Sequence, residues 1–322
     1  MKRRSLLLAA PLGWSLANIA LAQSAYPSKT IRYIVPVSAG GGSDMVGRTV
    51  CERLGRVLGQ TIVVDNLGGG GGVIASQTTA RAPADGYTLM QGYVATHGTA
   101  PATRKLPYDA IKDFTPIGMI GSTPNVLCVN AAMPIQDVKS FLDFVRKNPG
   151  KVSYGSAGAG SLTHLTAELF KLQTGAFMVH IPYRGGAAAQ TDIMAGNIEA
   201  SFQNFGTVVP YIRAGKMKAL AVTSKNRMPQ LPQVPTMIES GLADFDVTSW
   251  QAFAAPKGTP KDIIAKLHAD MAKGLRSADV TQRFNAQGFD IVANTPAEAS
   301  AFFKQEIDRW TAVVKQSGAT VD

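Results

Sequence analysis

The chain is poor in the residues that build metal sites and disulfide frameworks. Its 322 residues include two cysteines and four histidines, and none of them has Cys-x-x-Cys or His-x-x-His spacing. Cys51 falls in a stretch with helical periodicity, and Cys128 falls in an apolar, strand-like run. We therefore expect two buried, unpaired thiols, although export would permit a disulfide. We expect no metal and no cofactor.

Motifs for catalysis are also missing. The five glycines at 68–72 are not followed by Gly-Lys-Ser/Thr, so we interpret them as a flexible loop that opens a helix rather than as a phosphate loop. The serine-esterase elbow reads Gly-x-Ser-x-Gly, but Tyr154 stands where the first glycine before Ser156 would be. We therefore expect no catalytic residues and no enzyme activity.

The chain lacks the charge pattern of a nucleic-acid-binding protein. Lysine and arginine total 32 against 22 aspartate and glutamate, which gives a formal net charge of +10. No run of basic residues with interleaved aromatics occurs, so nucleic acid is not an expected partner. The basic excess would help to attract small anions.

Only the amino end carries a long apolar run. Residues 1–22 consist of a basic start, an apolar stretch interrupted by Pro11, and Ala20-Leu21-Ala22. This pattern predicts a signal peptide cut after about Ala22, and the run is short and interrupted for a transmembrane helix. Arg3-Arg4 also resembles a twin-arginine signal, which leaves the export route open. We expect a soluble mature protein in the periplasm.

Two similar units organise the rest of the chain. Residues 31–36 read as a β-branched strand, residues 38–44 as a glycine-rich loop, and residues 45–58 as a helix. The second unit has a strand at 151–155, a loop at 156–161 and a helix after it. Free amides and the helix dipole make such a loop suitable for an anion. We expect the two loops to face each other across a cleft.

Strands and helices alternate along the chain, which predicts an α/β fold with mostly parallel sheets. Two apolar runs between residues 114 and 129 are separated by residues 121–124, where we expect a crossing between two domains. Residues 246–255 read as a strand that crosses back. We expect domain 1 to comprise residues 26–122 and 249–322 and domain 2 to comprise residues 123–248, with the cleft between them closing on ligand. Residues 92–99 are expected to form a polar connection.

A series of short motifs follows one family pattern in order along nearly the whole mature chain. They include Tyr26-Pro27-Ser28-Lys29-Thr30-Ile31-Arg32, Pro83-Ala84-Asp85-Gly86-Tyr87-Thr88-Leu89, His180-Ile181-Pro182-Tyr183-Arg184-Gly185 and Leu231-Pro232-Gln233-Val234-Pro235-Thr236. The chain resembles the substrate-binding receptors of tripartite tricarboxylate transporters, the Bug family. The resemblance implies a two-domain periplasmic binding protein of type II, each domain a mostly parallel sheet flanked by helices.

The resemblance also implies a function. The expected protein is a monomeric receptor that binds a small carboxylate (a di- or tricarboxylate, an aromatic acid or an amino acid) and delivers it to membrane permease subunits. Two alternatives remain open. One is a secreted hydrolase of small esters or amides, and the other is a subunit that senses a solute rather than transporting it.

The resemblance implies that both glycine-rich loops hold the ligand carboxylate, partly through ordered water. The predicted contacts are Val37, Ser38, Ala39, Gly40 and Asp44 in the first loop and Ser156, Ala157, Gly158 and Ser161 in the second. Asp44 can equally be a plain helix cap. Many relatives have Phe-Pro-Pro where this chain has Val37-Ser38-Ala39, so the ligand of a particular relative should not be carried over.

The far end of the cleft should decide which ligand binds. Its predicted lining, by position after strands, is Tyr93, Thr96, Gln203 and Asn204, with His97 and Tyr183 as further candidates. Neutral amide and hydroxyl groups favour a polar or second carboxylate group reached through water. We therefore expect a small dicarboxylate or similar oxyanion, with an aromatic acid or amino acid next.

Overall fold

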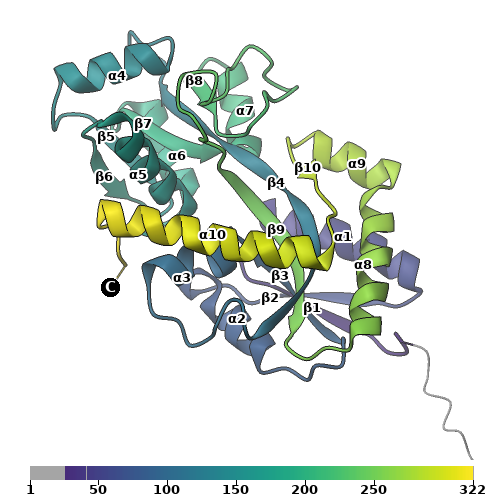
Figure 1. Cartoon of the computed structure of the whole chain (residues 1–322). Coiled ribbons are helices and arrows are strands. Elements are labelled where there is room, and N and C mark those ends of the chain that lie inside the picture. The colour runs from purple at the N-terminus through teal and green to yellow at the C-terminus, as the bar shows by residue number, and fades with distance from the viewer. Residues whose placement is uncertain (1–25, 41, 322) are drawn as a thin grey trace, which may run out of the picture.

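The computed structural model describes residues 26–40 and 42–321, and the predicted signal peptide lies outside these residues. Strands and helices alternate along most of the described chain (Figure 1). The strands are β1 (Ile31–Val35), β2 (Ile62–Asn66), β3 (Thr88–Tyr93), β4 (Phe114–Asn130), β5 (Ser153–Ser156), β6 (Val179–Pro182), β7 (Ala200–Asn204), β8 (Met217–Val222), β9 (Thr248–Pro256) and β10 (Asp290–Ile291). The helices are α1 (Gly42–Leu58), α2 (Val73–Ala80), α3 (Ala100–Thr103), α4 (Val138–Lys147), α5 (Leu162–Thr174), α6 (Gly186–Ala195), α7 (Phe205–Arg213), α8 (Lys261–Leu275), α9 (Ala278–Asn285) and α10 (Pro296–Ser317), with short turns η1 (Gly70–Gly72) and η2 (Ala95–Thr99).

The described strands form one mixed sheet in the order β2-β1-β3-β9-β4-β7-β5-β6, with β8 and β10 both paired to β4. The outer strands pair in parallel: β1 with β2 and β3, and β5 with β6 and β7. The central strands β4 and β9 are antiparallel to their neighbours. The α/β class is confirmed. Parallel pairing is confined to the two ends, because two long strands run across the middle in opposite directions.

The long strand β4 changes partners along its length. Up to Pro124 it pairs with β9, and from Asn125 it pairs with β7 and β8. In Figure 1 these two strands connect a group of elements containing α4 to α7 with a group containing α1, α2 and α8. The change of partner falls where the sequence predicted a crossing. The exact domain limits remain a prediction.

Helix α10 packs against both groups. It begins at a capping box formed by Thr295 and Glu298, as its Thr-x-x-Glu sequence predicts. Its buried Phe303 and Trp310 belong to one hydrophobic cluster that also contains Phe170 and Trp250. In Figure 1, α10 runs between the two groups of elements. Its buried residues contact Trp250 on strand β9 and helix α5 in the same cluster.

The connection expected at residues 92–99 is more ordered and more buried than predicted. Strand β3 continues to Tyr93, and residues 95–99 form a π-helical turn. The ring of His97 inserts between Phe114 and Phe303, at centroid distances of 4.7 and 5.0 Å. This apolar packing, which the polar sequence does not suggest, pulls the turn into the core.

Three further features of the described residues concern the cysteines, the lengths of the helices and the grouping of possible metal ligands. Cys51 and Cys128 are both free and buried. No described helix is both long enough and apolar enough to span a membrane. Within residues 26–40 and 42–321, no group of three or more His, Cys, Asp or Glu side chains is arranged to hold a metal ion.

Candidate functional site

The first glycine-rich loop is exposed and offers free amides. Strand β1 ends at Val35, and Ser38, Ala39 and Gly40 are all exposed before α1 begins. Among the described residues, no group accepts a hydrogen bond from the backbone N–H of Ser38 or Ala39. A negatively charged ligand could therefore bind both.

Asp44 holds this loop to its helix. Its side chain is only 3% exposed, and it accepts hydrogen bonds from Gly40 N (2.9 Å), Arg48 Nε (3.0 Å) and Asn66 Nδ2 (2.8 Å). Burial alone would raise the pKa of this carboxyl, but the bonds from Arg48, Gly40 and Asn66 lower it below its ordinary value. Both oxygens are engaged by the protein, which favours the capping role for Asp44 over a ligand contact.

The second glycine-rich loop uses several of its amides internally. Ala157 N donates to Thr163 Oγ1 (2.9 Å) and Gly158 N donates to Ser156 Oγ (3.1 Å). Ser161 caps α5 by accepting from His164 N. Among the described residues, the backbone N–H groups of Ala159, Leu162 and Thr163 have no acceptor. The sequence analysis did not name these three, although the first amides of any helix lack partners and could have signalled them.

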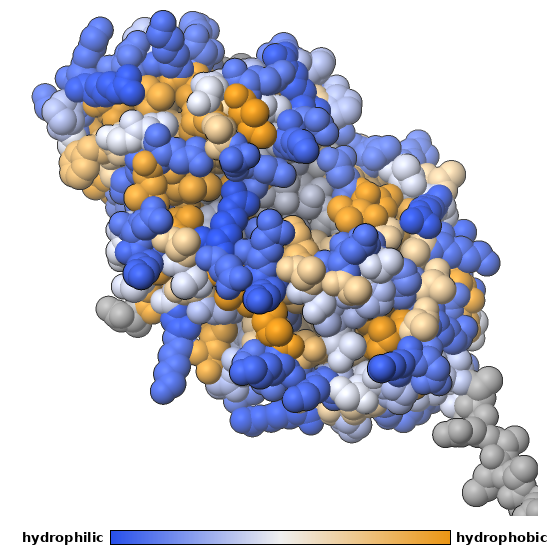
Figure 2. Space-filling view, viewed as in Figure 1, coloured by the Kyte–Doolittle hydropathy of each residue, from blue (hydrophilic) through white to orange (hydrophobic). Residues whose placement is uncertain are grey.

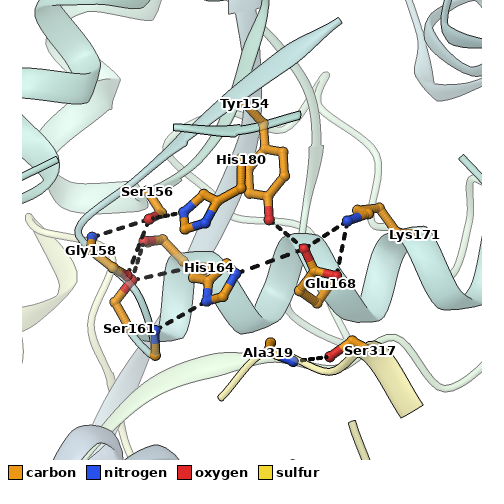
Figure 3. Close-up of polar contacts among 12 residues, drawn as sticks. Tyr154, Ser156, Gly158, Ser161, His164, Glu168, Lys171, His180, Ser317 and Ala319 are labelled. Carbon is orange, nitrogen blue, oxygen red and sulfur yellow. Dashed lines mark hydrogen bonds and ion pairs between the residues drawn. The ribbon is translucent and has the colours of Figure 1, made fainter. Parts of the chain in front are cut away.

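Two stacked histidines lie beside this loop and contact it (Figure 3). The rings of His164 and His180 lie 3.9 Å apart and nearly parallel. Nε2 of His180 is 2.6 Å from Oγ of Ser156, and Nδ1 of His164 accepts the N–H of Gly160 at 3.1 Å. The two rings therefore hold the loop at its first residue and at Gly160.

A buried glutamate completes the network in Figure 3. Glu168 accepts a hydrogen bond from the hydroxyl of Tyr154. Nζ of Lys171 donates to both carboxylate oxygens of Glu168, at 2.8 and 3.0 Å. Burial, aided by the neighbouring His164, lowers the pKa of His180 to about 4. Burial also lowers the pKa of His164. Both imidazoles are therefore neutral near pH 7.

The pairing of Ser156 with His180 invites comparison with a serine nucleophile. A catalytic triad needs a third group that orients the histidine. In the part of the chain that the structure describes, no carboxylate is hydrogen-bonded to His180. Ser156 itself is fully buried and accepts the amide of Gly158. The pair is therefore a structural support for the loop.

A cavity of about 410 Å³ opens where the second loop meets the end of β3 and the crossing strands. Four predicted site residues line it: Tyr93, Ala157, Ser161 and Asn204. The residues of the lining that the sequence analysis did not name include Gly71, Arg104, Asn125, Ala159, Gly160, Leu162, Thr163 and Ser249. All three free amides of the second loop thus belong to residues at the wall of this cavity.

Three predicted residues are turned inward instead. Thr96 is fully buried and bonds to the backbone of Tyr93. Ser156 is fully buried beneath the loop. Gln203 is 2% exposed because its amide accepts from Gln190 and donates to Ser201. None of the three lines the cavity, so a direct ligand contact would need these side chains to turn.

Two further candidates also point elsewhere. His97 is enclosed by aromatic rings, as described above, and burial lowers its pKa to about 3. The hydroxyl of Tyr183 donates to Asp192. Neither residue lines the cavity.

None of the predicted first-loop residues lines the cavity. Gly72 lies between Pro36, which precedes this loop, and Tyr93 of the cavity wall, because a Cβ placed there would lie 3.2 Å from Pro36 and 3.3 Å from Tyr93. Gly72 has φ +90°, and its missing side chain allows this close approach. Gly158 of the second loop is likewise adjacent to the cavity rather than part of its wall.

A larger hollow lies on the α10 side of the molecule. It measures about 660 Å³ and is lined by Trp250, Asp290 and Phe302 among others. It contains none of the predicted site residues. The cavity of 410 Å³ is smaller, but it is where free amides gather, and we take it as the candidate site.

Residues 46–319 match the family model described as tripartite tricarboxylate transporter family receptor. The protein BugT of Bordetella pertussis is 37% identical over 311 residues, covering 94% of each chain. An R. palustris protein, Rpa4515, solved with adipate, is 34% identical with a TM-score of 0.83 and covers 92% of this chain and 100% of its own. MatC from Rhodopseudomonas palustris, solved with bound malate, is 32% identical with a TM-score of 0.79, covering 90% and 100%.

These matches extend along almost the whole described chain and agree with its mixed α/β sheet. Members of the family are periplasmic solute-binding receptors and not enzymes. The hydrolase alternative is thereby removed, in agreement with the missing third group beside His180. The chain belongs to the tripartite tricarboxylate transporter receptor family and is a solute-binding receptor of the Bug type.

Proposed function

We propose that the chain is an exported receptor for a small carboxylate, with a dicarboxylate as the preferred class, which it delivers to the permease subunits of a tripartite transporter. The observation that carries this proposal is the group of three free amides, from Ala159, Leu162 and Thr163, at the amino end of α5. Each amide bonded to a charged group contributes roughly 1.5–3 kcal/mol. Three bonds reach roughly 5–9 kcal/mol before the entropy of binding is subtracted.

The first loop would bind the same carboxylate from the opposite side. Ser38 and Ala39 offer free amides close to the cavity, and a rotation about β4 and β9 would bring them onto the ligand. In this proposal residues 26–122 and 249–322 move as one domain, and residues 123–248 move as the other. The change of partner after Pro124 supports a hinge at that point.

The ligand class is supported by the related structures. Adipate and malate, which those two proteins hold, are both small dicarboxylates. A monomer is supported by the face shown in Figure 2, where hydrophobic residues form small separate groups among hydrophilic ones. The pattern of residues 1–22 supports export to the periplasm.

The proposal can be tested by removing a single amide. Leu162 is the first residue of α5, and Ser161 before it has φ −69° and ψ 160°, which suits a residue that precedes proline. Leu162→Pro removes the amide without breaking a helix hydrogen bond. Leu162→Ala is the matched control, because it loses the same side-chain packing but keeps the amide.

Isothermal titration of both variants with succinate, adipate and malate is the measurement. We expect Leu162→Pro to bind the best of these ligands at least tenfold more weakly than Leu162→Ala. Equal affinities of the two variants would remove the amino end of α5 from the site. If the unaltered protein binds none of these acids but binds uncharged solutes, the carboxylate function itself is wrong.

A further inference from the structure

Among residues 26–40 and 42–321, Arg104 places a positive charge without a counter-ion beside the candidate cavity. It follows α3 directly and contributes to the cavity wall. Its Nε is buried and lacks a hydrogen-bond partner, and its guanidinium forms no ion pair with any described residue. A buried donor without a partner is costly, and its presence calls for an explanation.

Two tyrosines lie close to Arg104, and Asp109 lines a second hollow that Arg104 also borders, without forming an ion pair with it. Its charge acts on the hydroxyls of Tyr93 and Tyr108, where it lowers the pKa against the larger raising effect of burial. Its Nη2 lies 4.0 Å from the point where a Cβ on Gly71 would stand. The guanidinium therefore lies near Gly71, which also lines the cavity.

Several other arginines of the described chain interact with a carboxylate, unlike Arg104. Arg32 and Arg48 each form an ion pair with an aspartate. Arg53 also has a buried Nε without a partner, but it lies close enough to Asp279 to lower the pKa of that carboxyl. Arg104 shows no comparable effect on a carboxyl.

A second unpaired donor lies in the same cavity. Asn125 is 1% exposed, lines the cavity from the crossing strand β4, and has a buried Nδ2 without a partner. Arg104 and Asn125 thus both line the cavity of about 410 Å³ whose wall also includes the residues with the free amides. That volume lies in the range of pockets that enclose small molecules.

We infer that Arg104 selects ligands that carry a second carboxylate, by pairing with the carboxylate distal to the one held at the start of α5. This rests on the proposed function and adds the residue that distinguishes dicarboxylates from monocarboxylates. A guanidinium presents paired donors that fit a carboxylate with two parallel hydrogen bonds. Asn125 donates to the same distal group or to water beside it.

The test compares acids of equal chain length in the full mature protein. Adipate is matched with hexanoate and succinate with butyrate, and affinities are measured by titration calorimetry at pH 7.5. Arg104→Gln removes the charge, and Arg104→Lys keeps the charge but loses the paired geometry. Arg81→Gln is the matched control, because Arg81 is exposed and the same charge is removed from the same half of the molecule.

We expect the unaltered protein to prefer each dicarboxylate over its matched monocarboxylate. Arg104→Gln should weaken dicarboxylate binding at least tenfold and leave monocarboxylate binding unchanged. Arg104→Lys should restore part of the preference, and Arg81→Gln should behave as the unaltered protein. The melting temperature without ligand should not fall in Arg104→Gln, since Arg104 forms no ion pair with any residue that the structure describes.

Two results would overturn the inference. Equal weakening of both acid classes by Arg104→Gln would mean that Arg104 does not bind the second carboxylate. Equal affinity of the unaltered protein for matched acids would also reject it, while leaving the carboxylate function intact. Failure to bind any carboxylate would instead reject the proposed function, whatever the role of Arg104.

Discussion

Nδ1 of His164 accepts the backbone N–H of Gly160 at 3.1 Å, which fastens the middle of the second loop to a buried ring. An imidazole accepts at Nδ1 only while it is neutral. Protonation would convert the acceptor into a donor and would place a positive charge beside His180, 3.9 Å away. Glu168 and Lys171 also face this pair, with opposite charges.

The first prediction concerns stability against pH. The pKa of His180 is about 4 in the folded chain and 6.5 in its ordinary state. As the pH falls below 6.5 the unfolded chain takes up this proton before the folded chain does, so stability is lost between pH 6.5 and about 4. His180→Gln, whose amide can still reach Ser156, should show a shallower fall of melting temperature over this range. An unchanged slope would contradict the assignment.

The second prediction concerns Asp44. Asp44→Ala leaves Gly40, Arg48 and Asn66 without their acceptor and should cost about 1–3 kcal/mol of unfolding free energy in urea. Asp44→Asn should cost less, because one acceptor oxygen remains. Because the folded-state pKa of this carboxyl is lowered, its contribution is present above pH 3.8 and lost below it. A large loss of ligand affinity in Asp44→Asn with unchanged stability would instead make Asp44 a ligand contact.

The third prediction concerns the joint between α10 and β9. Oε2 of Glu306 accepts from the indole N–H of Trp250 at 2.7 Å and of Trp310 at 3.1 Å. Glu306→Ala leaves two buried donors unpaired and should lower the unfolding free energy by about 2–4 kcal/mol. Glu306→Gln keeps an acceptor and should lose clearly less. Urea unfolding followed by tryptophan fluorescence measures both, and equal losses would show that the hydrogen bonds are not what matters.

The fourth prediction concerns the thiols. Cys51 and Cys128 are buried, and burial raises the pKa of both. Because the thiolate is the reactive form, neither should react with a thiol reagent at pH 8 in the folded protein. Two thiols per chain should react in denaturant. Only one reactive thiol, or none, in denaturant would indicate modification or a disulfide.

The general fold could be predicted because periodic apolar residues determine it locally. Val46, Val50 and Leu54 recur at helical spacing and are all buried on α1. The family motifs then placed the elements in two groups. The antiparallel centre could not be predicted, since the pairing of β9 with β3 and β4 depends on residues far apart in the sequence.

One of the two predicted loops lines the candidate cavity, whereas its three unpaired amides were not predicted. A glycine-rich loop before a helix can be recognised from Ser156 to Ser161, but which amides remain free depends on how Thr163 and His164 fold back onto it. Gln203 precedes Asn204, yet only Asn204 reaches the cavity, because neighbouring strand residues point to opposite faces. Arg104 carried no local pattern at all. Its role depends on the absence of a partner, which only the folded chain reveals.

The position of β9 between β3 and β4 affects how the chain can fold. Gln91 and Gln251, whose amides meet there, are 160 positions apart. Strand β3 therefore keeps an unpaired edge until residues 248–256 have been synthesised. Contacts so distant in sequence make folding slow, and an open strand edge is prone to aggregation. A fragment that stopped before Thr248 would retain the exposed edge permanently.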